Sequence, residues 1–337
     1  MAHMQKVSDT PDHHMPRVLI VCGPTASGKT NLAVSLAKRF DGELVSADSR
    51  QIYKYVDVIT GKDLPLQSRA SVRQTLKYRD KEYTLVTHTI DTIPVWMYDV
   101  MTPDEQCSIS LYRFLANAAI SDILSRGKLP VIVGGAGLYI DSIVHPPETI
   151  DIPPDLKARE YRNTLTAEAL QADLASLDPE RLAMMNISDR NNPRRLIRAI
   201  EIAQWQAEHD SISPTTRGFD CYWVGIKWPI DILSARIRAR VNERWGSGAI
   251  DEVKRLKALY KVLPGAEILG FIPIMQFLDK RVTEAEAKDT WVNDEIAYAK
   301  RQMVWFKRQK DIHWVDGEQK GIDRQVEKDV RQWYTKE

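Results

Sequence analysis

The chain has 337 residues, of which 28% are charged and 43% are hydrophobic, and its formal net charge is +1. A chain of this length can bury a large core, and we expect it to form two structural units. The near-zero net charge excludes a protein-wide excess of positive charge, so any surface for nucleic acid must be a local basic patch.

The three cysteines, Cys22, Cys107 and Cys221, lie far apart and include no C-x-x-C pair. This spacing argues against a zinc module or a disulfide framework and predicts a cytoplasmic protein. No apolar run approaches the roughly 18 to 20 residues of a membrane span, so we expect no membrane association. Residues 1–16 begin Met-Ala-His-Met and stay polar, which indicates a disordered tail with an expression remnant and not a signal peptide.

The first motif follows a short apolar run, Val18 to Cys22, which is predicted to be a buried strand. It is the complete phosphate-binding-loop pattern G-x-x-x-x-G-K-T. Its glycines let successive backbone N–H groups converge on one anion, and the lysine adds a positive charge. The threonine offers a hydroxyl to Mg²⁺ at the start of a helix. The candidate diphosphate or nucleotide ligands are therefore Gly23, Pro24, Thr25, Ala26, Ser27, Gly28, Lys29 and Thr30.

A second predicted strand, residues 43–47, ends directly before Asp48. A carboxylate at the carboxyl end of a strand in an open α/β sheet points into the ligand crevice. Asp48 is thus a candidate general base or metal-associated residue. A helix N-cap is an equally good interpretation from its position, because aspartate is favoured there.

Residues 66–95 are predicted to be a surface β insertion without assigned chemistry. The stretch from Tyr78 to Ile90 alternates and is rich in β-branched and aromatic residues, and residues 79–81 could turn a hairpin. His88 lies in that alternation, so we interpret it as a strand residue and not as a metal ligand.

The next stretch predicts a helix over residues 110–125 and a buried strand over residues 129–133, followed by the glycine-rich turn 134–139. Strand, helix, strand and glycine turn in this order predict an α/β fold with a parallel sheet flanked by helices. The glycines would allow close approach of a ligand, although a tight strand-to-helix turn also requires glycine.

The composition changes at Pro146-Pro147, which indicates a domain boundary, and residues 155–187 are helical in pattern. A helix is predicted to begin at Pro193, with Leu196 and Ile197 facing inward and three arginines on exposed turns. A solvated charged face is the simpler explanation of those arginines. Two further basic helices, residues 231–245 and 298–308, nevertheless raise the prospect of nucleic acid.

Five separated blocks together resemble the bacterial tRNA dimethylallyltransferase family, also called tRNA isopentenyltransferases or IPP transferases. The resemblance runs from about Arg17 to Trp314 in one consistent order. The blocks are Gly23-Pro-Thr-Ala-Ser-Gly-Lys-Thr30, Ala47-Asp-Ser-Arg-Gln-Ile-Tyr53, Gly134-Gly-Ala-Gly-Leu-Tyr139, Asn192-Pro-Arg-Arg-Leu-Ile-Arg-Ala-Ile-Glu201 and Ala299-Lys-Arg-Gln-Met-Val-Trp-Phe306.

The resemblance implies an α/β, P-loop NTPase-like parallel sheet core flanked by helices, with an inserted helical domain. We expect the core over residues 17–145, the tRNA-facing insertion over 146–200, a C-terminal helical part of the core over 201–320 and a tail over 321–337. Such enzymes transfer a dimethylallyl group from dimethylallyl diphosphate to N6 of adenine 37, beside the anticodon of tRNA. The implied cofactor is Mg²⁺, the implied partner is the tRNA anticodon stem-loop, and a monomer is expected.

The resemblance also implies roles for individual residues. Asp48 would be the general base, Arg240 and Lys29 would support the diphosphate, and Thr30 would bind the metal. Residues that match tRNA-contacting positions of the family are Asp48, Ser49, Arg50, Gln51, Ala136, Lys157, Arg194, Arg195, Leu196, Ile197 and Arg198.

The chain departs from the family pattern at several positions. Ala136 stands where the family usually has threonine, and Glu267 and Ile272 stand where it has cations. The segment Trp96-Met-Tyr98 replaces a histidine-containing one. Two other interpretations remain open, namely a dimethylallyltransferase that acts on free adenine nucleotide, and a nucleotide-dependent P-loop kinase or binding module.

Overall fold

The computed structural model describes residues 15–64, 70–209, 218–260 and 268–335. These residues divide into two compact units, one formed by residues 15–145 together with 218–335, and the other by residues 146–209. Residues 1–14 of the predicted tail over 1–16, residues 66–69 of the predicted β insertion, and Glu267 lie outside the described residues.

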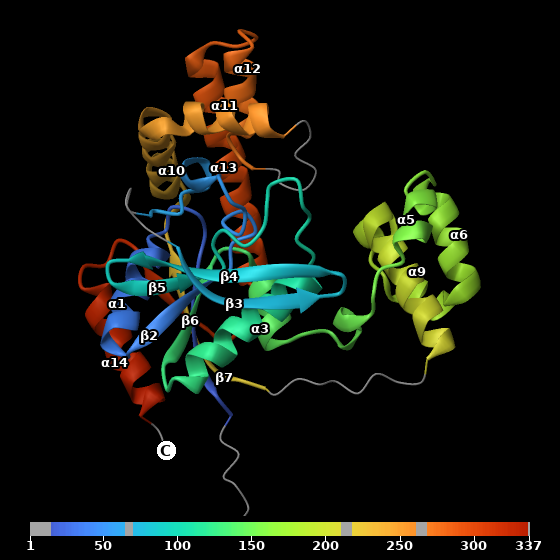
Figure 1. Ribbon diagram of the computed structural model, residues 1–337, viewed down its shortest axis with the longest axis horizontal. Coiled ribbons are helices and arrows are strands. Elements are labelled where there is room, and N and C mark those ends of the chain that lie inside the picture. The colour runs from blue at the N-terminus through green and yellow to red at the C-terminus, as the bar shows by residue number, and fades with distance from the viewer. Residues whose placement is uncertain (1–14, 65–69, 210–217, 261–267, 336–337) are drawn as a thin grey trace, which may run out of the picture. The chain divides into compact units, whose positions relative to one another are not determined.

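The first unit is built on one sheet of eight strands (Figure 1). From edge to edge the strands are β3 (Ser71–Tyr78), β4 (Lys81–Ile90), β5 (Ile93–Trp96), β2 (Gly42–Ser46), β6 (Leu129–Gly134), β1 (Arg17–Cys22), β7 (Asp220–Lys227) and β8 (Ile312–Asp316). The six neighbouring strands β5, β2, β6, β1, β7 and β8 run parallel to one another. Strand β4 runs antiparallel to both of its neighbours, β3 and β5. The expected parallel core is therefore confirmed.

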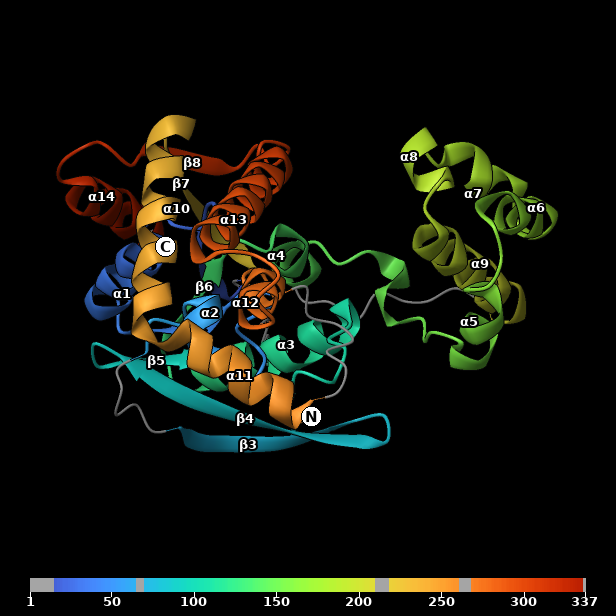
Figure 2. The same ribbon diagram turned by 90° about the horizontal axis from the view of Figure 1, so that it is seen from above.

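Helices cover both faces of the sheet, which explains why the central strands are continuously apolar. On one face, α1 (Lys29–Arg39) packs with α14 (Ile322–Tyr334). On the other lie α3 (Ile109–Ser125), α4 (Gly137–Val144), α10 (Ile230–Arg244) and α13 (Glu284–Phe306). The helices α11 (Ile250–Leu259) and α12 (Phe271–Leu278), the single turn α2 (Asp57–Thr60) and a π-helical turn (Trp245–Ala249) between α10 and α11 also belong to this unit (Figure 2).

The predicted hairpin is present, with strands β3 and β4 joined through Arg79 and Asp80. Arg79 adopts the left-handed conformation, with φ of 56°, which a two-residue hairpin turn requires. The hairpin is not a separate surface element, because β4 pairs with β5 and extends the central sheet. Leu85, which is fully buried, anchors β4 in the core.

Two of the predicted parts of the chain have a different structure from the one that we expected. Residues 201–320, expected to be helical, also supply strands β7 and β8, whose apolar side chains complete the sheet. Residues 321–337, expected to be a tail, contain helix α14, and its Val326 and Val330 are buried against α1.

The second unit is entirely helical among its described residues. It contains a short 3₁₀ turn (Glu148–Asp151), α5 (Leu156–Arg162), α6 (Ala167–Leu177), α7 (Pro179–Met184), α8 (Ile187–Arg190) and α9 (Pro193–Glu208). Helix α9 begins at Pro193 as predicted, with the Asn192 side chain accepting from backbone N–H groups of the first turn. It continues past residue 200, so this unit extends beyond the boundary that the sequence predicted.

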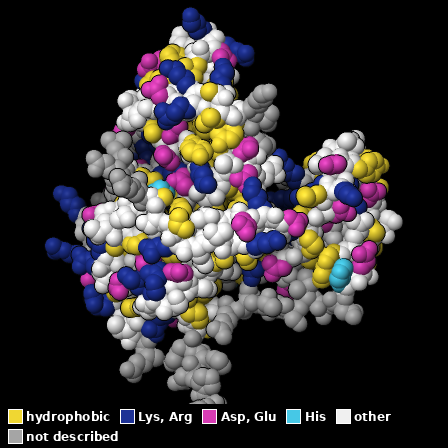
Figure 3. Space-filling view, viewed as in Figure 1, with side chains coloured by type: hydrophobic (Ala, Val, Ile, Leu, Met, Phe, Trp, Pro, Cys, Tyr) yellow, Lys and Arg dark blue, Asp and Glu magenta, His cyan; other side chains and the backbone are white. Residues whose placement is uncertain are grey.

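Charges of both signs are interspersed over the face in Figure 3, in keeping with the net charge of +1. Among the helices that the structure describes, none combines the length and apolarity needed to cross a lipid bilayer.

Candidate functional site

The phosphate-binding loop connects β1 to α1 and has the curled backbone that the motif predicts. Gly23, Ala26 and Gly28 all have positive φ, at 146°, 60° and 91°. Glycine is required at position 23, because a Cβ there would lie 2.9 Å from the carbonyl oxygen of Ile226. The first turn of α1 has no side-chain cap, so its backbone N–H groups are available to an anion.

Lys29 lies at the first position of α1, and its Nζ donates a hydrogen bond to the carbonyl oxygen of Pro24 at 3.2 Å. Burial lowers the pKa of Lys29 to about 8, although the negative charge of Asp48 opposes the shift. An anion bound in the loop would stabilise the charged form of Lys29, because the anion would replace the solvation that the ammonium group loses on burial.

Three residues from distant parts of the chain hold the loop. Gln302 on α13 accepts a hydrogen bond from the backbone N–H of Thr25 at 2.9 Å. The indole Nε1 of Trp228 donates to the Ser27 carbonyl at 3.0 Å, and Nε of Arg236 donates to the Ala26 carbonyl at 2.8 Å. Sequence reasoning missed all three contacts, and only Gln302 was signalled, by its place in a family-like block.

Asp48 follows strand β2, where the backbone N–H of Ala47 still donates to the Val133 carbonyl at 2.8 Å. One carboxylate oxygen of Asp48 accepts from the backbone N–H of Arg50 at 2.9 Å, which closes a turn. No helix begins at Asp48, because the segment continues as turns, so the helix N-cap interpretation is wrong. The carboxylate keeps further acceptor positions for a ligand.

A cleft of about 390 Å³ including its opening lies at the carboxyl ends of the strands. It brings the predicted catalytic residues Lys29, Thr30, Asp48 and Arg240 together. The other lining residues are Thr25, Gln51, Thr60, Gly61, Tyr98, Val133 and Gly134. Parallel strands place their carboxyl ends at one edge, which is why residues so far apart in sequence converge here.

Arg240 reaches the cleft from α10. Its Nη2 donates to the carbonyl oxygen of Gly61 at 3.2 Å and to the Asp63 carboxylate at 3.0 Å. The cleft therefore presents the cationic side chains of Lys29 and Arg240, several hydroxyl groups including that of Thr30, and a half-buried carboxylate. Such a set suits a reaction in which a diphosphate leaves and a weakly basic nitrogen loses a proton.

The residues after Asp48 are held inside the first unit. The Arg50 guanidinium lies over the ring of Tyr298 on α13, at 4.0 Å from its centroid. Gln51 accepts from the Ser46 hydroxyl at 3.0 Å and donates to the Gly61 carbonyl at 3.0 Å. Ser49, Arg50 and Gln51 are all half-buried, and a tRNA contact for them stays a prediction.

In the turn after β6, close packing requires glycine at positions 134 and 137. A Cβ at Gly134 would lie 2.0 Å from the Ala47 carbonyl oxygen, and one at Gly137 would lie 2.0 Å from the Trp305 ring. Ala136 donates its backbone N–H to the Ala47 carbonyl at 3.0 Å, which joins the turn to the segment that carries Asp48.

In the second unit, the predicted RNA-contacting residues fall into two groups. Lys157 and Arg194 are exposed, and Arg195 is exposed but paired with Asp189. Arg198 is half-buried, donates to the Thr149 carbonyl at 2.7 Å, and pairs with Glu201 at 3.4 Å. The sequence predicted Arg198 on an exposed turn, and the structure shows instead that its side chain is half-buried.

Leu196 and Ile197 face inward, as the helix pattern predicted, and this conflicts with the contact of their side chains with RNA that the family resemblance implied. They are 0% and 3% exposed and pack with Leu170, Leu174 and Ile200 in the core of the second unit. Their side chains stabilise this unit and cannot contact RNA while it is folded. Of the two positions at which the resemblance led us to expect cations, Ile272 is 64% exposed on α12, and Glu267 lies outside the described residues.

Comparisons with known proteins identify the family of this chain. A family model described as IPP transferase matches residues 51–309, and one described as isopentenyl transferase matches residues 16–84. The chain is 34% identical to a tRNA dimethylallyltransferase of Exiguobacterium sp., covering 91% of this chain and 92% of that relative. It is also 34% identical to a tRNA dimethylallyltransferase of Roseiflexus sp., covering 95% and 99%. The crystal structure of the full-length tRNA isopentenylpyrophosphate transferase from Bacillus halodurans matches with a TM-score of 0.63 at 29% identity, covering 94% and 96%.

Proposed function

Because this chain belongs to the IPP transferase family, we propose that its cleft transfers a dimethylallyl group from dimethylallyl diphosphate to N6 of adenine 37 in tRNA. The observation that carries the proposal is the convergence of Asp48 with Lys29, Thr30 and Arg240 in one cleft beside the phosphate-binding loop. All of these groups come from one chain, so we propose that the enzyme acts as a monomer.

The chemistry explains why these residue types are needed. The exocyclic amine of adenine is a weak nucleophile, because its lone pair is delocalised into the ring. As N6 attacks C1 of the allylic substrate, the C1–O bond to diphosphate breaks, and Asp48 accepts the proton that N6 loses. The leaving diphosphate is received by the backbone N–H groups of the loop, Lys29 and Arg240. The loop thus holds a leaving group and transfers no phosphoryl group.

A divalent cation fits this set of side chains. The described residues contain no cluster of three or more His, Cys, Asp or Glu that could hold a metal by itself. Mg²⁺ does not need one, since it binds through one or two protein oxygens together with substrate phosphates and water. We propose that Thr30 and the diphosphate would hold it, with Asp48 nearby, and that it would neutralise charge developing on the leaving group.

Assays of the purified protein with dimethylallyl diphosphate and Mg²⁺ test the proposal. We expect dimethylallyladenosine in an anticodon stem-loop RNA that carries adenine 37, and none in the same RNA with guanine 37. Product from AMP but not from the RNA would support the enzyme that acts on free nucleotide. Tight ATP binding with no use of dimethylallyl diphosphate would support the kinase or binding module, and either result would overturn the proposal.

A further inference from the structure

Residues 57–63, which form α2 and the turn after it, provide the immediate support of Arg240. The Gly61 carbonyl oxygen accepts from Nη2 of Arg240 and from Nε2 of Gln51, at 3.2 and 3.0 Å. The Asp63 carboxylate accepts from the same Nη2 at 3.0 Å. The direction in which Arg240 points is therefore set by where this segment, the 57–63 segment, is held.

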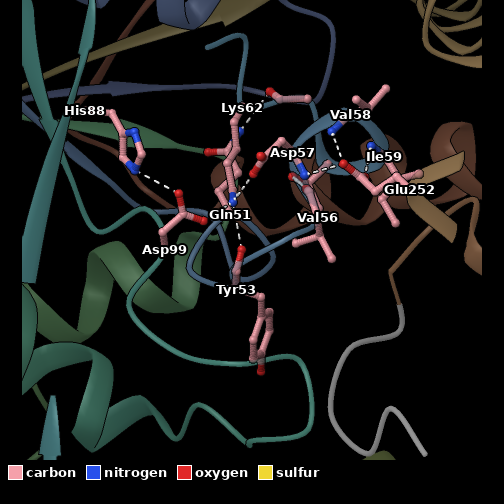
Figure 4. A network of polar contacts seen from close by, with 12 residues as sticks. Gln51, Tyr53, Val56, Asp57, Val58, Ile59, Lys62, His88, Asp99 and Glu252 are labelled. Atoms are coloured by element: carbon pink, nitrogen blue, oxygen red, sulfur yellow. Dashed lines mark hydrogen bonds and ion pairs between the residues drawn. The ribbon is translucent and has the colours of Figure 1, made fainter. Parts of the chain in front are cut away.

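Lys62 anchors the segment from inside the protein. Its side chain is 0% exposed, which is unusual for a lysine. Its Nζ donates to the Tyr53 carbonyl at 2.7 Å, to Asp57 at 2.6 Å and to Asp99 (Figure 4). These three acceptors match the three donors of an ammonium group.

Asp99 extends this anchor to the β3–β4 hairpin. Its second carboxylate oxygen lies 2.8 Å from Nε2 of His88 on β4 (Figure 4). Burial raises the pKa of Asp99, but the contacts with His88 and Lys62 outweigh it and hold the pKa below its ordinary value. Asp99 is therefore ionised at neutral pH and compensates the buried charge of Lys62.

The other end of the segment is held from α11 and α10. The Glu252 carboxylate accepts from the backbone N–H groups of Asp57, Val58 and Ile59, at 2.8, 2.9 and 2.9 Å (Figure 4). Gly61 has a φ of 63°, and a Cβ there would lie 2.5 Å from Nη2 of Arg240. From α10, Nη1 of Arg244 donates to the Ile59 carbonyl at 3.3 Å, so a shift of the segment would also move the Gly61 carbonyl to which Arg240 donates.

We propose that Lys62, held by Asp99 and through Asp99 by His88, is a positioning residue for the transfer reaction. It fixes the 57–63 segment so that Gly61 and Asp63 aim Arg240 at the leaving diphosphate. This inference rests on the proposed function, because it assigns Arg240 to the diphosphate. It also connects the β3–β4 hairpin to the cleft, through His88.

A double-mutant cycle separates positioning from a merely structural role. We expect Lys62→Met to lower kcat roughly 10- to 100-fold in the otherwise native protein, with a smaller change in KM for the RNA. In the Arg240→Ala background the same change should lower kcat less than about threefold, since its effect passes through Arg240. A purely structural role predicts the same factor in both backgrounds, and that result would overturn the proposal.

Arg126→Met provides a matched control. Arg126 pairs with Glu43, which is 2% exposed and lies near the start of β2, at the opposite end of the strand from Asp48. This variant breaks an ion pair away from the cleft in which the carboxylate is buried and the arginine side chain is 33% exposed. We expect it to lower the melting temperature with kcat within about twofold of wild type. An equal loss of kcat in both variants would show that general destabilisation explains the Lys62 effect.

Substitutions of His88 provide a second test in case the Lys62→Met variant does not fold. We expect His88→Leu to lower kcat roughly three- to tenfold, and His88→Gln to restore it to within about twofold, because an amide can still donate to Asp99. Both changes should have little effect in the Arg240→Ala background. Equal activity of His88→Leu and wild type would overturn the proposal.

Calorimetric titration with inorganic diphosphate distinguishes failure of this inference from failure of the proposed function. We expect the Lys62 or His88→Leu variant to bind diphosphate more weakly, by a factor that disappears in the Arg240→Ala background. If the wild type transfers no dimethylallyl group but this coupling is present, the proposed function fails and Lys62 still positions Arg240. Unchanged diphosphate binding, in an active enzyme, would overturn the inference alone.

Discussion

Replacement of Arg240 by alanine tests the leaving-group assignment most directly. The Arg240 side chain is 25% exposed, and it lines the cleft with Lys29 and Thr30. A unit charge pair at about 4 Å is worth about 4 kcal/mol at the effective dielectric constant of such a site. Partial exposure and the opposing charge of Asp63 reduce this figure, so we expect a loss of about 2 to 4 kcal/mol of transition-state stabilisation. That range corresponds to a fall in turnover of roughly 30- to 1,000-fold.

The assay is the initial rate of transfer from radiolabelled dimethylallyl diphosphate to an anticodon stem-loop, with inorganic diphosphate as a competitive inhibitor. Arg240→Ala should raise the inhibition constant of diphosphate as well as lower the rate. Arg238→Ala is the matched control, because Arg238 lies on the same helix, is 55% exposed and pairs with Asp289. Turnover of Arg240→Ala within twofold of that of Arg238→Ala would refute the assignment.

Four further predictions follow from the site and from the second unit. Asp48→Asn should lower kcat by roughly 10² to 10⁴ with little change in RNA affinity, as measured by single-turnover kinetics and filter binding. Because burial lowers the pKa of Lys29 to about 8, below the ordinary 10.5, the free folded enzyme loses this proton at a pH where the unfolded chain keeps it. Calorimetric affinity for diphosphate should therefore fall as pH rises through about 8, by up to about tenfold per unit, relative to Lys29→Met. Glu201 is 4% exposed and accepts two hydrogen bonds from one arginine, so Glu201→Ala should lower the free energy of unfolding of the second unit by about 2 to 4 kcal/mol, as measured by hydrogen exchange in α9. Replacing exposed Lys157 and Arg194 by alanine should each flatten the slope of log affinity against log salt by roughly 0.7 to 0.9, as measured with an anticodon stem-loop.

Each of these predictions has an outcome that contradicts it. Near-normal turnover of Asp48→Asn would show that Asp48 is not the general base and serves only to close the turn, by accepting from the backbone N–H of Arg50. A diphosphate affinity with the same pH dependence as that of Lys29→Met would exclude Lys29 as the titrating ligand. Unchanged exchange in the Glu201 variant would make its ion pairs unimportant for stability. An unchanged salt slope would show that Lys157 and Arg194 form only a solvated face.

The sequence alone determined the features that depend on local backbone chemistry. The phosphate-binding loop needs glycine at defined positions and a lysine and threonine at the start of a helix, so one short stretch specified its conformation. Asn192-Pro193 specified the start of α9 in the same way, and the β-branched alternation around Arg79-Asp80 specified a hairpin. Asp48 could be placed at the ligand edge, because a strand of five buried residues led into it.

Only the tertiary structure decided which distant side chains support the site. Gln302 reaches Thr25 across 277 positions of sequence, and Lys62 meets Asp99 across 37. No local pattern in either segment encodes these pairs, because long-range contacts depend on how α13 packs against the sheet and on how the segments after α2 and β5 come together. Arg198 shows the same limit, since the sequence predicted it on an exposed turn and packing instead half-buries it beside Thr149 and Glu201. The role of a side chain depends on whether packing buries the face of the helix or strand on which it lies, and the sequence pattern predicts the buried face only in part.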